Sequence, residues 1–154
     1  SLYPAKLAQQ EGFHQLVWTD AKTHSFIEES GTMNIMFVIN DTLITPSEDA
    51  DTILRGTTKR TVIEVAKKMG IPVEERTVSV EEIITAAKNN TLQEVFGAGT
   101  AATIAQIALI GYRDERIELP ALETRQISNR IKDYLDAVKS GEQPDTNHWV
   151  LKVC

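Results

Sequence analysis

Two short runs that combine glycine with threonine are the residues of this sequence best suited to chemistry. They are Gly56-Thr57-Thr58 and Gly97-Ala98-Gly99-Thr100. Each run offers backbone N–H groups and a hydroxyl. The first precedes a helical pattern, where unpaired donors and the positive end of the helix dipole favour an anion. Together with an acidic segment at residues 27–34, the two runs indicate a site for a phosphorylated cofactor.

Each run also has a plain structural interpretation. Thr57 or Thr58 is a candidate N-cap of the helix that follows, so helix capping alone would explain these threonines, although a capped helix start still attracts anions. Gly97 and Gly99 are explained equally well by an ordinary loop between two strands. As a ligand loop, they would let the backbone approach closely, because glycine has no Cβ.

The composition fits one globular domain and excludes some partners. The chain has 154 residues, of which 42% are hydrophobic and 25% charged, enough to bury a core of its own. Its formal charge of −6 argues against a nucleic-acid or anionic-membrane surface, because such surfaces need clustered Lys and Arg. The basic pairs Lys59-Arg60 and Lys67-Lys68 fall on a predicted helix, where a solvated face explains them.

The remaining residue types point to an ordinary cytoplasmic protein. Cys154 is the single cysteine, so we expect no internal disulfide and no Cys-based metal site. The histidines, His14, His24 and His148, lack metal-ligand spacing. No apolar run approaches the roughly 20 residues of a membrane span, and no signal peptide is visible.

Alternation, periodicity and turn residues predict an alternating α/β order along the chain. Strands are expected at residues 13–19, 25–29, 33–39, 42–45, 73–78, 91–96, 103–110 and 113–117, and helices at 2–11, 57–69, 80–89 and 121–139. Ser79 and Glu82 are spaced as a capping box for the third helix.

The order of these pieces resembles the larger, C-terminal part of a branched-chain amino acid aminotransferase, a pyridoxal-phosphate (PLP) enzyme of fold type IV. The segments that carry the resemblance are residues 12–20 (GFHQLVWTD), 28–35 (EESGTMNI), 53–60 (ILRGTTKR) and 96–102 (FGAGTAA). The resemblance covers nearly the whole chain, residues 1–154. It implies an α/β fold, a mixed-sheet pseudo-barrel with outer helices, as in the large domain of fold type IV enzymes.

The resemblance also implies roles for individual residues. Glu29 is the carboxylate at the pyridine nitrogen, whereas its strand neighbour Glu28 points to the opposite face. The residues implied to bind the cofactor are Glu29, Leu54, Gly56, Thr57, Thr58, Gly99 and Thr100, with Leu54 against the ring and the threonines on the phosphate. Those implied at the substrate are Thr32, Ala101 and Ala102.

Three differences from the family pattern matter. The chain opens at Ser1 in the middle of a predicted helix, so Ser1 looks like a cut point, and the family's Schiff-base lysine has no match. Lys6 lies nearest but on that helix, where an exposed lysine is expected. Arg55 replaces a proline that relatives often carry, and Ala102 and Ala105 replace the Cys-x-x-Cys pair of some relatives.

The resemblance implies that the intact protein is a homodimer that moves the amino group between Leu, Ile or Val and 2-oxoglutarate. No catalytic residue is expected in this chain, so we expect it to be inactive alone. The alternatives are another fold type IV enzyme, a D-amino acid aminotransferase or an aminodeoxychorismate lyase, and a non-catalytic module that kept the fold. Residues 31–34 favour the branched-chain group.

Overall fold

The computed structural model describes residues 2–49 and 51–151. Its elements, in chain order, are α1 (Leu2–Gln10), β1 (Val17–Thr19), β2 (Ile27–Ser30), β3 (Met33–Ile39), β4 (Thr42–Pro46), α2 (Thr57–Lys68), β5 (Val73–Arg76), α3 (Val80–Lys88), β6 (Leu92–Gly99), β7 (Thr103–Gln106), β8 (Leu109–Tyr112), β9 (Glu115–Glu118), a 3₁₀ turn (Leu122–Thr124) and α4 (Ile127–Ser140). Ser1 and Cys154, which figured in the sequence-based expectations, lie outside the described residues.

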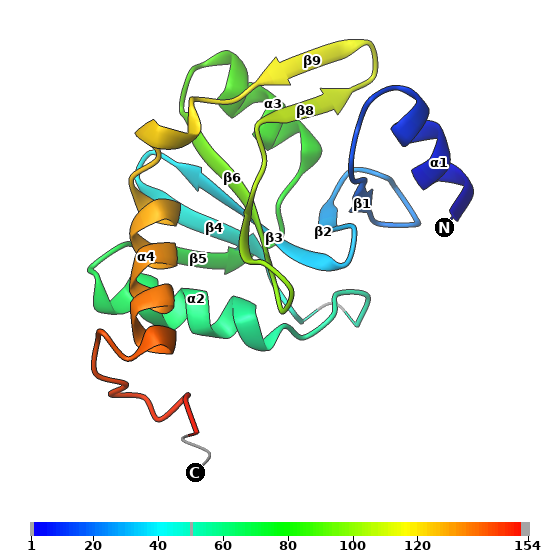
Figure 1. Ribbon diagram of the computed structural model, residues 1–154. Coiled ribbons are helices and arrows are strands. Elements are labelled where there is room, and N and C mark those ends of the chain that lie inside the picture. The colour runs from blue at the N-terminus through cyan, green and yellow to red at the C-terminus, as the bar shows by residue number, and fades with distance from the viewer. Residues whose placement is uncertain (1, 50, 152–154) are drawn as a thin grey trace.

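Strand β3 is the centre of a seven-stranded mixed sheet (Figure 1). One edge of β3 pairs with β2 at its start and with β4 at its end, and the other edge pairs with β6. Strand β5 pairs with β4 in parallel, while the other pairs in this sheet are antiparallel. Strands β8 and β9 form a separate hairpin.

A bridge between the start of β2 and the segment after β5 closes the strand pairing into a circuit. Phe26 pairs with Ser79, and the Ile27 N–H donates to the Val78 carbonyl at 2.8 Å. Because β5 also pairs with β4 and β2 pairs with β3, the strands curl around one another. The predicted α/β fold with a mixed, barrel-like sheet and outer helices is therefore confirmed.

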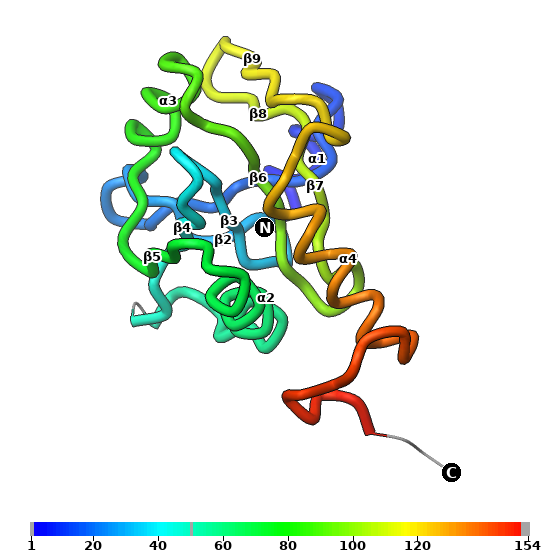
Figure 2. Tube along the Cα trace, turned by 90° about the vertical axis from the view of Figure 1, so that its left-hand side faces the viewer, coloured from blue at the N-terminus to red at the C-terminus, as the bar shows by residue number. Residues whose placement is uncertain are grey.

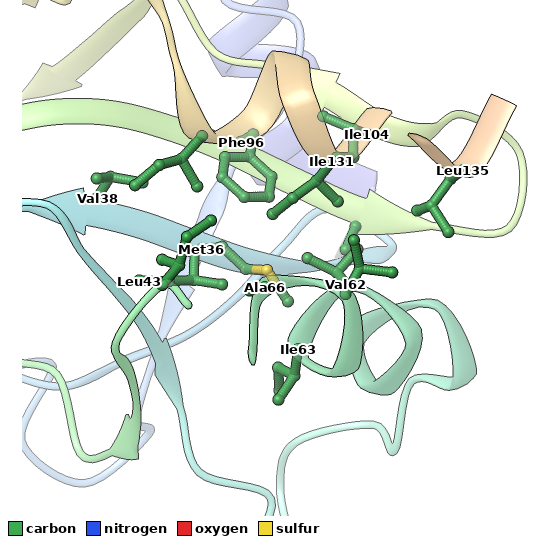
Figure 3. Packing of buried hydrophobic residues seen from close by; sticks show 14 residues of the cluster. Met36, Val38, Leu43, Val62, Ile63, Ala66, Phe96, Ile104, Ile131 and Leu135 are labelled. Carbon is green, nitrogen blue, oxygen red and sulfur yellow. The ribbon is translucent and has the colours of Figure 1, made fainter. Parts of the chain in front are cut away.

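Both faces of β3 are buried, which explains its nearly continuous apolar sequence. Met36 and Val38 belong to a core shared with α2 and α4, whereas Ile35 and Phe37 belong to a second core shared with α3. Figure 3 shows the first core closing between α2 and α4, and Figure 2 shows α3 and α4 on opposite sides of the strands. Alternate side chains of one strand thus hold both helical layers.

The amphipathic helix predicted after Gly56 is confirmed as α2. Val62, Val65 and Ala66 are buried, and Met69 packs against the same core. None of the helices in the described part of the chain has the length and apolar character that a bilayer crossing requires.

Four predicted boundaries were wrong. Only Val17–Thr19 of the strand expected at residues 13–19 is paired. Strand β6 runs on through Gly99 instead of ending at Phe96. The strand expected at residues 103–110 is two strands, because the Ile107 N–H turns back to the Val95 carbonyl. The last helix begins at Ile127 rather than at residue 121, because Arg125 has an extended backbone.

Helix capping also differs from prediction in two places. Gly56, and neither Thr57 nor Thr58, is the N-cap of α2. At α3, Ser79 accepts the Glu82 N–H at 3.0 Å as predicted, but the Glu82 carboxylate bonds to the Arg76 guanidinium at 2.9 and 2.5 Å. A bidentate pair between two charged groups is stronger than a single hydrogen bond from a backbone N–H to the carboxylate, so the ion pair prevails.

Two buried charged residues anchor α4 to the sheet. The Glu94 carboxylate of β6 accepts the N–H groups of Ile127 and Ser128, each at 2.8 Å, and so caps α4 from outside the helix. The Arg125 guanidinium donates to the Gln106 side-chain oxygen at 2.7 Å and to three backbone carbonyls, those of Val95, Ile107 and Pro120. Burial lowers the pKa of Arg125, and the nearby Glu94 charge opposes that shift.

We expect Glu94→Gln to lower the free energy of unfolding by about 1–3 kcal/mol, because one of two buried acceptor oxygens becomes a donor facing an N–H. Urea denaturation followed by far-UV circular dichroism measures it. Glu118→Gln, at an exposed position of β9, is the matched control. Equal unfolding midpoints for the two variants would contradict the capping role of Glu94.

Candidate cofactor-binding site

The predicted cofactor segments converge on the first residues of β3. Asn34 lies directly opposite Glu29 of β2 on one side and Ala98 of β6 on the other. Residues directly opposite in a sheet share a face, so Glu29, Asn34 and Ala98 face the same side as Met36, the side covered by α2. The topology therefore gathers the acidic strand end, the second glycine run and the start of α2.

Glu29 is fixed by the loop that leads into α2. Its Oε1 accepts the Leu54 N–H at 2.5 Å. Glu28 reaches the same loop, since its Oε1 accepts the Thr52 hydroxyl at 2.8 Å. Adjacent residues of a strand point to opposite faces, yet both carboxylates bind the same loop, Glu28 at Thr52 and Glu29 at Leu54.

The Leu54 peptide is held at both ends by side chains. Glu29 accepts its N–H, and the Asn34 amide nitrogen donates to its carbonyl at 2.9 Å. Leu54 is 71% exposed, which leaves its apolar surface free to contact a ligand ring. A Cβ on Gly56 would lie 1.9 Å from the Asn34 amide oxygen, so glycine is required at that position.

The start of α2 is suited to bind an anion. Its N-cap is a glycine that makes no side-chain cap hydrogen bond, and its first turn contains no acidic residue. Over residues 2–49 and 51–151, no hydrogen bond engages the hydroxyls of Thr57, Thr58 or Thr100. Unpaired first-turn N–H groups beside such hydroxyls match the donors that a phosphate needs.

A buried ammonium supports this helix start from beneath. Lys59 is 1% exposed, and its Nζ donates to the Pro46 carbonyl at 2.7 Å. Glu48 lies 3.7 Å from that Nζ and also accepts the Gly56 N–H at 3.2 Å. Burial lowers the pKa of Lys59, and the Glu48 charge partly restores it.

The second glycine run belongs to the sheet and only its end forms a turn, which corrects the predicted loop. Gly97 and Gly99 lie in β6, and Cβ atoms there would meet the Met33 side chain at 2.9 and 2.8 Å. Their immediate role is therefore to accommodate Met33. The exposed turn comprises Thr100, Ala101 and Ala102, and Figures 1 and 2 place it on the α2 side of the sheet.

The other residues named from sequence make no side-chain hydrogen bond to the Leu54–Gly56 turn within the described residues. Thr32 is exposed in the turn between β2 and β3, next to the first residue of β3. Arg55 is exposed, and Lys6 is exposed on α1. Contacts therefore bring together Glu29, Leu54 and Gly56, while the two turns flank them.

Three residues of this site were missed from sequence. Asn34, Glu48 and Lys59 make the contacts that hold the Leu54–Gly56 turn and the start of α2. One signal was present for Asn34, since it is the polar residue within an otherwise apolar strand. Lys59 was assigned to a solvated face, because its position on the helix gives no sign that Pro46 and Glu48 lie over it.

Gly56→Ala should destabilise the chain by about 1–3 kcal/mol, because the new methyl group displaces the Asn34 amide from a packed site. Gly97→Ala is the control, since its closest contact is the flexible end of Met33, which can move. Thermal and urea unfolding measure both variants. A smaller loss for Gly56→Ala than for Gly97→Ala would contradict the packing of Asn34 on Gly56.

The lowered pKa of Lys59 predicts the sign of a pH effect. Between that folded-state pKa and the ordinary value of 10.5, the unfolded chain binds more protons than the folded one. Stability contributed by Lys59 therefore increases with pH across this window. Relative to Lys59→Met, the wild type should gain unfolding free energy as urea titrations move from pH 7 toward pH 10. A relative loss would show that ion pairing outweighs burial.

Comparisons with known proteins agree with this geometry. The family model for amino-transferase class IV matches residues 1–110. Branched-chain-amino-acid aminotransferase 2 of Bacillus subtilis is 35% identical over 153 residues, which span 99% of this chain and 42% of that protein. The Escherichia coli branched-chain amino acid aminotransferase structure has a TM-score of 0.80 at 26% identity, covering 98% of this chain and 47% of that chain.

A third relative extends the fold comparison. An aminotransferase from Brucella abortus, solved with PLP bound, has a TM-score of 0.67 at 23% identity over 85% of this chain and 41% of its own. The present chain thus spans less than half the length of these relatives. Its fold is that of fold type IV aminotransferases, and the class IV family is PLP-dependent. With the family model matching well over half of its residues, the chain belongs to the class IV aminotransferases.

Proposed function

We propose that residues 1–154 form the PLP-binding C-terminal domain of a branched-chain amino acid aminotransferase. The observation that carries this proposal is the Leu54 peptide, which the Glu29 carboxylate and the Asn34 amide hold shortly before the N-terminus of α2. A carboxylate, an exposed leucine and a phosphate-type cradle in sequence order fit a phosphorylated pyridine. Relatives named as branched-chain aminotransferases support this activity for the intact protein.

In this proposal each part of the cofactor meets a different group of residues. The Glu29 carboxylate holds the proton on the pyridine nitrogen, and Leu54 packs against the ring. The phosphate is bound by Thr57, Thr58 and Thr100. Gly56 and Gly99 are assigned to the cofactor site through their backbone, since the space that a side chain would take there is filled by Asn34 and Met33. The features that support the fit are the first-turn N–H groups of α2, which no side chain caps, and the hydroxyls of Thr57 and Thr58, which make no hydrogen bond within the described residues.

When bound, PLP supplies a carbonyl that takes up the amino group and a ring that withdraws electrons from the reacting carbon. The chain orients this ring and keeps its nitrogen protonated through Glu29. We place Thr32, Ala101 and Ala102 at the substrate, where exposed N–H groups of the β6–β7 turn would bind the carboxylate of Leu, Ile, Val or their 2-oxo acids. No residue of this chain is assigned the covalent lysine's role.

The intact protein is proposed to be a cytoplasmic homodimer that exchanges amino groups with 2-oxoglutarate. The 154-residue chain alone should therefore give no measurable transfer from leucine to 2-oxoglutarate, because it provides the cradle without a matching lysine. A coupled glutamate assay of the purified chain tests this. Turnover above the level that free PLP gives would contradict the prediction that no lysine of this chain forms the Schiff base.

Cofactor binding tests the proposal directly. We expect the chain to bind PLP and to leave no adduct after borohydride reduction, as judged by intact mass. Pyridoxamine 5′-phosphate, which cannot react with lysines, gives the affinity. Glu29→Gln should weaken that affinity by about 10- to 100-fold, the range expected for a lost charge-assisted hydrogen bond, while affinity for inorganic phosphate stays unchanged.

Two results would overturn the proposal. One is wild-type chain that binds neither PLP nor pyridoxamine 5′-phosphate. The other is a Glu29→Gln variant with the same affinity as the exposed control Glu118→Gln, because then the carboxylate would not lie at the ring.

A further inference from the structure

The Asn34 side chain connects the three segments assigned to the cofactor. Its backbone pairs with Glu29 on β2 and with Ala98 on β6, and its amide nitrogen donates to the Leu54 carbonyl at 2.9 Å. Its amide oxygen would lie only 1.9 Å from a Cβ at position 56, so it occupies the space beside Gly56. Asn34 is 7% exposed, and its hydrogen bond to Leu54 is partly buried.

The chemistry of this position requires an amide. The Leu54 carbonyl needs a donor, which the NH₂ group supplies, and the Leu54 N–H already has Glu29 as its acceptor. A carboxylate at residue 34 would face a carbonyl oxygen without a proton and would lie beside Glu29. An alanine would leave the carbonyl without its donor.

We propose that Asn34 is a positioning residue for the cofactor. By holding the Leu54–Gly56 turn, it keeps the Glu29 carboxylate and the start of α2 at a fixed separation. The inference rests on the proposed function. Asn34 acts through Leu54 and Gly56 and is not assigned a contact with the cofactor. Without the Asn34 hydrogen bond, Glu29 and the start of α2 would each still bind their own part of the cofactor, but the distance between them would no longer be fixed.

The position of Asn34 in the sheet explains its effect. Asn34 is anchored by strand pairing on both sides within the buried sheet, whereas the described residues between β4 and α2, 47–49 and 51–56, belong to no strand. Each hydrogen bond from that loop to β2 or β3 therefore transfers the rigidity of the sheet to the loop. Asn34 supplies the one that reaches the Leu54 carbonyl.

Asn34→Asp and Asn34→Ala test this positioning role in the 154-residue chain, with Asn90→Asp as the matched control. Asn90 is exposed and has a φ of +56°, a conformation that aspartate also tolerates. The first readout is amide hydrogen exchange without ligand. Both Asn34 variants should speed exchange of the Leu54 amide by about tenfold or more, leaving amides in the centre of β3 unchanged, and Asn90→Asp should change neither.

The second readout is binding of pyridoxamine 5′-phosphate compared with inorganic phosphate. Both Asn34 variants should lower the affinity for pyridoxamine 5′-phosphate by about tenfold and the affinity for phosphate by much less, because phosphate alone does not span the two halves of the site. If the wild type binds pyridoxamine 5′-phosphate and Asn34→Ala binds it with the same affinity, only the Asn34 inference is overturned. Absence of wild-type binding would instead overturn the proposed function, and the inference with it. Unchanged exchange at Leu54 in both variants would contradict the positioning role whatever the affinity.

Discussion

The burial of β3 on both of its faces is the constraint on which the rest of this structure depends. One set of alternating side chains packs against α2 and α4, and the other packs against α3. A strand in this position cannot shift by one residue without exchanging its two cores, so its register is strongly specified. That fixed register determines where Met33 and Asn34 lie, and therefore where the candidate site is built.

The candidate site is assembled around the first residues of β3 from parts that come from other segments of the chain. A loop, a helix start and a hairpin turn each contribute polar groups, and all three contact β2, β3 or β6. Leu54, Thr57 and Thr100 are exposed, as a binding site requires, whereas Asn34 and Lys59, which hold the loop and the helix start, are buried. Rigid elements thus position groups that loops present, which is the usual division of labour at a binding site.

Local patterns predicted much of this fold. The apolar run of β3, the hairpin turn after it and the periodicity of α2 each depend on neighbours in sequence, and all three are confirmed. Long-range contacts account for the errors. Gly97 and Gly99 stay within β6 because that strand pairs there with β3 and β7. The start of α4 is set by Glu94, which lies more than 30 positions earlier in the sequence.

The same distinction applies to the site. The roles proposed for Glu29 and for the threonines at the start of α2 come from the family resemblance, because composition and spacing alone leave these residues open to a structural interpretation. Asn34, Glu48 and Lys59 were missed because their importance lies in contacts across 8 to 20 positions of sequence. A buried polar residue in an apolar strand is the signal that would have identified Asn34.

The central claim is that one ligand spans Glu29 and the start of α2. The most direct test is a two-dimensional amide NMR titration of the chain with pyridoxamine 5′-phosphate. The account predicts that the largest shift changes occur together at Leu54, Thr57, Thr58 and Thr100, with the same dissociation constant at each. Changes confined to another surface, or shifts at α2 without any at Leu54, would contradict it.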